Sequence, residues 1–148
     1  MENRISTTIE QSKELVRLGL DPKTADMCWV KDYTEQWVLI ADTQINIRRR
    51  FEGMYEHSGF KWQEHIELVP AWSLSALLEV MPSFIDYKGQ KLRLTIEKAG
   101  VWNVFYIGTK HRLNEIWFNG EYGDPVEPAY KMVCWLFEKG LIKKEGQD

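Results

Sequence analysis

The fold is decided by the stretch Pro70-Ala71-Trp72-Ser73-Leu74-Ser75-Ala76-Leu77-Leu78-Glu79-Val80-Met81-Pro82. Within it, leucine and methionine recur at the spacing i, i+3, i+4 and i+7, which is typical of a helix with one apolar face. Ser73 can cap the start of this helix, and Pro82 prevents its continuation. The stretch therefore predicts a short helix whose apolar face must be buried against other elements.

A three-stranded meander is predicted downstream of this helix. Residues 91–97 alternate apolar and polar side chains without error, which predicts a strand whose wet face carries Lys91 and Arg93. Residues 101–107 are apolar on both faces and are expected to form a central strand. Residues 114–118 are predicted to form the third strand.

Two further helices are predicted near the ends of the chain. Thr7 and Glu10 have the spacing of a capping box, and Gly19 is a natural stop for the helix that follows them. Asp124 followed by Pro125 is typical of the start of a helix, and apolar residues at helical spacing continue from there.

The region 27–68 predicts additional strands. In residues 45–51, the side chains of Ile45, Ile47 and Phe51 fall on one side of a strand, and only Arg49 breaks the alternation. Residues 53–59 are expected to form a turn or loop. The other predicted strands of this region lie over 27–30, 36–41 and 60–68.

These patterns together predict a single α+β domain over residues 1–148. An antiparallel β-sheet, made of the meander 91–118 plus strands from 27–68, is expected to pack against three main helices. The length of 148 residues suits one domain of this kind.

Charge and cysteine usage exclude several function classes. The 19 Lys and Arg residues are balanced by 22 Asp and Glu residues, so the net charge of −3 steers the protein toward neither nucleic acid nor an anionic membrane. No apolar run approaches the roughly 20 residues of a membrane span. Cys28 and Cys134 lack the spacing of a zinc site, although a disulfide between them is left open. We expect a cytoplasmic protein without a cofactor or a structural metal.

Catalytic signatures are weak in this sequence. No Gly-x-Ser-x-Gly elbow or glycine-rich phosphate loop occurs. Cys28 and Cys134 lie in apolar stretches, which raise the pKa of a thiol rather than lower it. A metal site built from His57, His65 and Glu64 requires that residues 53–68 form a hairpin. An enzyme with an unfamiliar site therefore stays an alternative without assigned catalytic residues.

Tryptophan is unusually frequent, with 7 residues in 148. Aromatic side chains either fill a core or mark a recognition surface. Because they lie in the least regular region, we expect Trp29, Trp37 and Trp62 to be exposed and to bind an unknown protein partner. The sequence thus favours a non-enzymatic binding or adaptor protein. The tryptophans expected in the core are Trp72, Trp102 and Trp135.

Nucleic-acid binding is the sharper alternative. Arginine and lysine residues are interleaved with aromatic residues, as in a groove that stacks bases. Nearby acidic residues, among them Glu52, Glu56 and Glu64, weaken the positive character of this region. The residues of the alternative interface are Arg48, Arg49, Arg50, Phe51, Lys61, Trp62, Lys91 and Arg93.

Three stretches carry a family resemblance: 5–12 with 19–27, 70–79, and 123–126 leading to Trp135-Leu136. Together they resemble a small family of uncharacterised proteins encoded in prophages and other mobile elements of gut anaerobes. The resemblance covers both ends and the middle helix, while the region 30–69 is longer than the family pattern. It implies a phage or mobile-element accessory protein that acts inside a bacterial cell, and it carries no activity, cofactor or catalytic residue. In that setting we expect the partner to be a host or phage protein.

Overall fold

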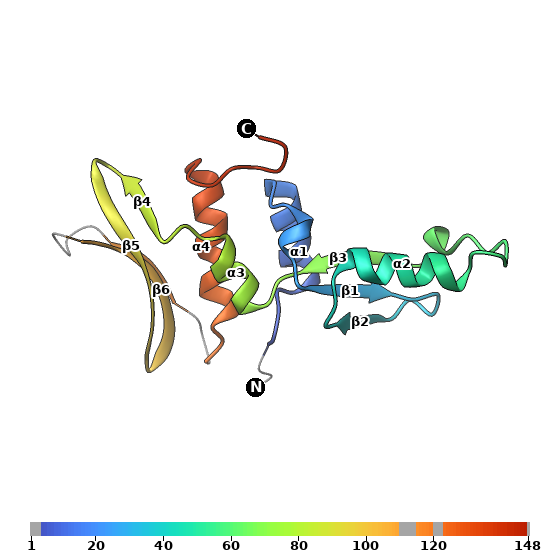
Figure 1. Ribbon diagram of the computed structural model, residues 1–148. Coiled ribbons are helices and arrows are strands. Elements are labelled where there is room, and N and C mark those ends of the chain that lie inside the picture. The colour runs from blue at the N-terminus through green and yellow to red at the C-terminus, as the bar shows by residue number, and fades with distance from the viewer. Residues whose placement is uncertain (1–3, 110–114, 120–122, 148) are drawn as a thin grey trace.

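The computed structural model describes residues 4–109, 115–119 and 123–147 of the chain. It shows an elongated α+β molecule in which an antiparallel sheet lies toward each end and helices lie between them (Figure 1). The predicted α+β class is confirmed, but the strands are divided between two sheets. The α-helices of the described residues are α1 (Ile9–Leu18), α2 (Gln44–Met54), α3 (Leu74–Val80) and α4 (Val126–Glu138).

The larger sheet contains the predicted meander. Its first hairpin turns at Lys88 and Gly89, whose φ angles of 50° and 76° match the two left-handed positions of a type I′ turn. Lys91 and Arg93 are exposed, as expected, while Leu92 between them is fully buried. The sequence did not predict the first strand, and position 114 lies outside the described residues. In spatial order the strands are β4 (Phe84–Tyr87), β5 (Gln90–Ala99), β6 (Val101–Gly108) and β7 (Glu115–Asn119).

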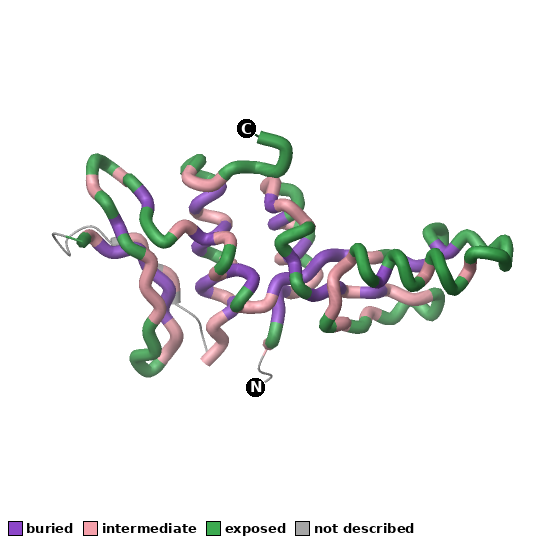
Figure 2. The backbone as a smooth tube through the Cα atoms, viewed as in Figure 1, coloured by how far each residue is buried: buried purple, intermediate pink, exposed green. Residues whose placement is uncertain are grey.

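The main core lies where α3 and α4 meet this sheet. Figure 2 shows buried residues along these helices, whereas α2 at the other end of the molecule is mostly exposed. Trp72 and Tyr106 are the largest fully buried side chains, and the Tyr106 hydroxyl donates a hydrogen bond of 2.6 Å to the carbonyl of Pro82. The core role predicted for Trp72 is confirmed, and Trp135 packs half-buried against the same core.

The helix termini agree with the predicted motifs to within one residue. Ser73 caps α3, and Asp124 accepts a hydrogen bond of 3.0 Å from the amide of Val126 at the start of α4. The capping box of α1, however, is formed by Thr8 and Gln11, one residue after the predicted pair. Thr7 does not cap the helix; its hydroxyl instead accepts a hydrogen bond of 3.1 Å from the amide of Trp72.

The smaller sheet is built from the region 27–68 and the residues after it. The strands predicted over 27–30 and 36–41 are confirmed. The strand predicted over 60–68 is mostly wrong, because Trp62–Glu64 forms a 3₁₀ turn and the strand begins only at Glu67. The spatial order is β2 (Trp37–Ile40), β1 (Met27–Lys31) and β3 (Glu67–Ala71), with antiparallel pairing throughout.

The strand predicted over 45–51 is wrong, because these residues belong to α2. The hydroxyl of Thr43 caps this helix by accepting a hydrogen bond of 3.2 Å from the amide of Asn46. Ile47 and Phe51 lie one helical turn apart and both face the smaller sheet. Arg49, the residue that broke the strand pattern, is exposed on the helix surface.

Candidate functional site

One face of the smaller sheet is covered by α2. Alternate residues of a strand point to opposite faces, and Cys28 and Val30 of β1 point toward the helix. There they form a second, smaller core together with Ile47, Trp62 and Ile66. This core is separate from the main core and depends on α2 for its cover.

The opposite face of the smaller sheet carries two of the three tryptophans that the sequence singled out. Trp29 is paired with Leu39 across β1 and β2, and Trp37 is paired with Lys31. All four side chains are partly exposed. We call the surface formed by Trp29, Trp37 and Leu39 the open sheet face, because α2 covers the other side.

The indole of Trp29 is held in place by the N-terminal segment. Its Nε1 donates a hydrogen bond of 3.0 Å to the carbonyl of Thr7. Thr7 is itself buried, and its amide donates to the carbonyl of Trp72 at 2.9 Å. This hydrogen bond therefore restricts the orientation of the Trp29 ring.

The ring of Trp37 lies beneath two lysine side chains. The ammonium groups of Lys13, from α1, and Lys31, from β1, each lie 5.8 Å from the centre of the ring. Such cation–π contacts contribute about 0.5–1 kcal/mol each at exposed sites. Lys13 also lies 3.7 Å from the carboxylate of Glu67.

A shallow groove of about 380 Å³ runs along the open sheet face beside the N-terminal segment. Trp29 and Leu39 form its floor on the sheet side, and Ile5 and Ile9 contribute apolar side chains opposite them. Ile5 is 62% exposed, which is unusual for a large aliphatic side chain. Leu39, Ile5 and Ile9 could not be predicted from the sequence, because their proximity depends on strand register and on the path of the N-terminal segment.

The expectation that Trp62 is exposed is wrong. Its side chain is only 5% exposed, and its ring stacks on Phe51 with 5.4 Å between the centroids. Trp62 lies under α2, on the side of the sheet opposite Trp29 and Trp37. A helix at 44–54 could have been found from Asp42-Thr43, because a residue that caps a helix precedes an apolar pattern of four-residue spacing.

The residues of the nucleic-acid alternative fall into two separated groups. Arg48, Arg49 and Arg50 are exposed on α2, where consecutive residues are rotated by about 100° around the helix axis. Arg50 is paired with Asp42. Lys91 and Arg93 lie on β5, in the sheet at the other end of the molecule (Figure 1). Lys61 is exposed, Phe51 is half-buried and Trp62 is buried, so the aromatic residues expected to stack on bases serve the small core instead.

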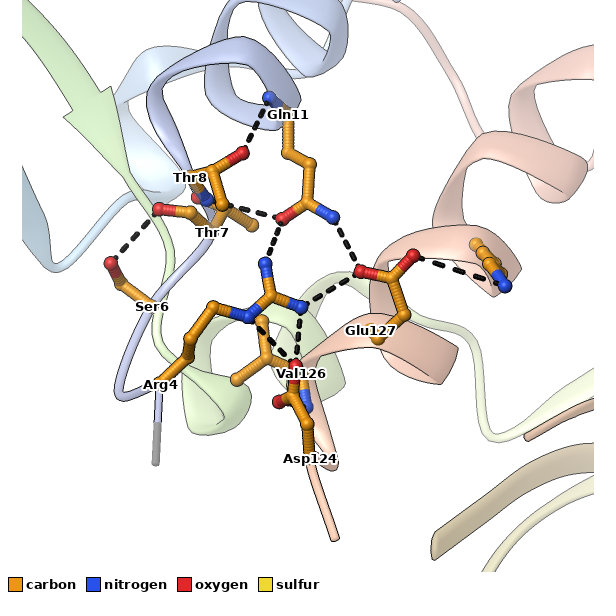
Figure 3. Close-up of polar contacts among 9 residues, drawn as sticks. Arg4, Ser6, Thr7, Thr8, Gln11, Asp124, Val126 and Glu127 are labelled. Atoms are coloured by element: carbon orange, nitrogen blue, oxygen red, sulfur yellow. Dashed lines mark hydrogen bonds and ion pairs between the residues drawn. The ribbon is translucent and has the colours of Figure 1, made fainter. Parts of the chain in front are cut away.

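The densest polar cluster surrounds Arg4 (Figure 3). The guanidinium donates to Asp124 with Nε at 2.7 Å, to Glu127 at 2.8 Å and to the amide oxygen of Gln11 at 2.9 Å. Gln11 also donates to Glu127 at 2.6 Å. Donors and acceptors are thus matched within the cluster, which ties the N-terminal segment to α4 and fixes the wall of the groove.

Neither cysteine has the surroundings of a nucleophile. Cys28 and Cys134 are free thiols, so the disulfide left open by the sequence is absent. Burial raises the pKa of the Cys28 thiol to about 11 and also raises that of Cys134, which keeps both protonated near neutral pH. Among residues 4–109, 115–119 and 123–147, no group of three His, Cys, Asp or Glu side chains could hold a metal ion.

No family model, no curated protein and no solved structure matches this chain. Within the part of the chain that the structure describes, no helix has both the length and the apolar character needed to cross a membrane.

Proposed function

We propose that this chain is a non-enzymatic binding or adaptor protein, and that the open sheet face engages a protein partner. The observation that carries the proposal is that Trp29 and Trp37 lie on the same face of the sheet, beside an apolar groove of about 380 Å³. Tryptophans that are partly exposed and held in one orientation are typical anchors of protein interfaces. The phage or mobile-element setting, with a host or phage protein as the partner, rests on the sequence resemblance alone.

Replacing Trp37 with alanine is expected to abolish partner binding while the fold is kept. The ring is only partly buried and lies beneath Lys13 and Lys31, so its loss should lower the free energy of unfolding by about 1–2 kcal/mol. Removal of an interface tryptophan, in contrast, typically weakens binding by about 2 kcal/mol or more. Quantitative affinity purification from the native cell, with wild-type and variant chains as bait, measures the loss of binding.

Phe84→Ala is the matched control for this experiment. Phe84 is 48% exposed and also lies beneath a lysine, with the Lys91 ammonium 4.6 Å from its ring, but it belongs to the other sheet. The proposal expects that the same proteins are retained by wild type and Phe84→Ala and lost by Trp37→Ala. Retention of one set of proteins by all three chains would contradict it.

A further inference from the structure

The free edge of β2 borders the open sheet face. β2 is the outermost strand of its sheet, and its residues Trp37-Val38-Leu39-Ile40 include neither a charge nor a proline. Val38 is 53% exposed. Proteins commonly protect such edges with charged residues or proline, because an unprotected edge pairs readily with another strand. The edge of β2 lacks both of these protections.

The backbone of β2 presents hydrogen-bonding groups toward this edge. The amide of Asp32 donates to the carbonyl of Gln36 at 3.2 Å, which places this pair in the hydrogen-bonded class. The two classes of pair alternate along an antiparallel ladder, so Val38 and Ile40 are bonded toward β1. Trp37 and Leu39 consequently direct their N–H and C=O groups outward, at the two-residue spacing that an added strand requires.

Two lysine ammonium groups lie over the ring of Trp37, and they indicate which side chain a further strand beside β2 would need to carry. The ammonium of Lys13 lies near Glu67, at 3.7 Å. Lys31 has no ion-pair partner among the described residues. Its ammonium lies over the ring of Trp37, which belongs to the edge strand β2. A carboxylate on a strand added beside Trp37 would complete this arrangement. Beside Leu39, the apolar groove requires an apolar side chain.

We propose that an extended segment of a partner protein adds to β2 as a fourth strand. It places an acidic side chain beside Trp37 and, two positions away, an apolar side chain beside Leu39. This inference rests on the proposed binding function and specifies how the partner is held. A second copy of β2 fits less well, because the residues Trp37-Val38-Leu39-Ile40 bring no carboxylate to Lys31.

The test uses a library of random decapeptides displayed on phage and selected on the full-length chain. Selected peptides are expected to share an acidic and an apolar residue two positions apart. When a selected peptide is added to the ¹⁵N-labelled protein, amide hydrogen exchange at Trp37 and Leu39 should slow at least tenfold. Exchange at Val38 and Ile40, already bonded to β1, should change little.

Two changes test the charge and the edge separately. Lys31→Gln should weaken binding of the acidic peptide about fivefold, as expected for an exposed ion pair, and leave binding of its amide analogue unchanged. Leu39→Pro removes an outward N–H without removing a bond to β1, and it should abolish binding. The exchange measurement remains decisive if this variant fails to fold.

Three results would overturn strand addition. The first is peptide binding that is lost in Trp37→Ala while exchange at Trp37 and Leu39 stays unchanged, which would leave the proposed function intact. The second is a wild-type dimer that becomes monomeric in Leu39→Pro, which would assign the edge to a second copy. The third is a selection that enriches no peptide; strand addition would then fall, while the affinity purification with Trp37→Ala would still decide the proposed function.

Discussion

Trp62→Ala is expected to lower the free energy of unfolding by about 3–5 kcal/mol, the usual cost of truncating a buried aromatic side chain. Trp62 is 5% exposed and fills the small core between α2 and the β1–β3 sheet, where it stacks on Phe51. Truncation would leave a cavity beside Phe51 and Ile47, which contact the ring in that core. Urea unfolding followed by far-UV circular dichroism measures the loss.

Phe60→Ala is the control for this prediction. Phe60 is close to Trp62 in sequence and contacts the ring of Tyr55, with centroids 4.7 Å apart, but it is 39% exposed. Its truncation should cost less than about 1 kcal/mol. If Trp62→Ala and Phe60→Ala lowered the free energy of unfolding by the same small amount, Trp62 would not be packed between α2 and the sheet.

The sequence predicted β5, β6 and β7 of the larger sheet, but not β4, because the signals of these three strands are local. In β5, Leu92, Leu94 and Ile96 alternate completely with polar residues, and in β6 residues 101–107 are apolar on both faces. Neither signal depends on distant parts of the chain. The α3 helix could also be predicted from local signals, because its cap, Ser73, and the proline that ends it, Pro82, lie within the same short stretch.

A strand was wrongly predicted in place of α2 because two periodicities overlap in this part of the sequence. Ile45, Ile47 and Phe51 satisfy a two-residue period except at Arg49, while Ile47 and Phe51 also satisfy a four-residue spacing. Arg49 interrupts the two-residue period of a strand, but it does not interrupt the four-residue spacing of a helix, so its position favoured the helix. The misreading also reversed the assignment of Trp62, because only a helix at 44–54 can cover that ring.

The candidate site was predicted in part. Trp29 and Trp37 could be named because both are large aromatic residues in the region where the sequence pattern is least regular. Their common face could not, since it depends on the register that pairs Trp29 with Leu39. The groove beside them depends on Ile5, whose position is set by the contacts of Arg4 with α4.

Trp72→Ala should be as costly as Trp62→Ala, at about 3–5 kcal/mol, but its effect should spread through the whole molecule. Trp72 is fully buried in the main core, and its Nε1 donates to the hydroxyl of Thr24 at 2.9 Å. Its backbone also exchanges two hydrogen bonds with Thr7, which carries the carbonyl that binds Trp29. The residue therefore joins β3, the N-terminal segment and the main core.

Amide hydrogen exchange distinguishes the two tryptophans. In Trp62→Ala, faster exchange is expected in α2 and the β1–β3 sheet, while β5, β6 and α4 keep their protection, because the small core is separate from the main one. In Trp72→Ala, both sheets should lose protection together. Trp72→Phe keeps most of the buried volume and loses only the bond to Thr24, so it should cost about 1–2 kcal/mol. Loss of protection confined to one sheet in Trp72→Ala would show that Trp72 does not couple the two ends of the molecule.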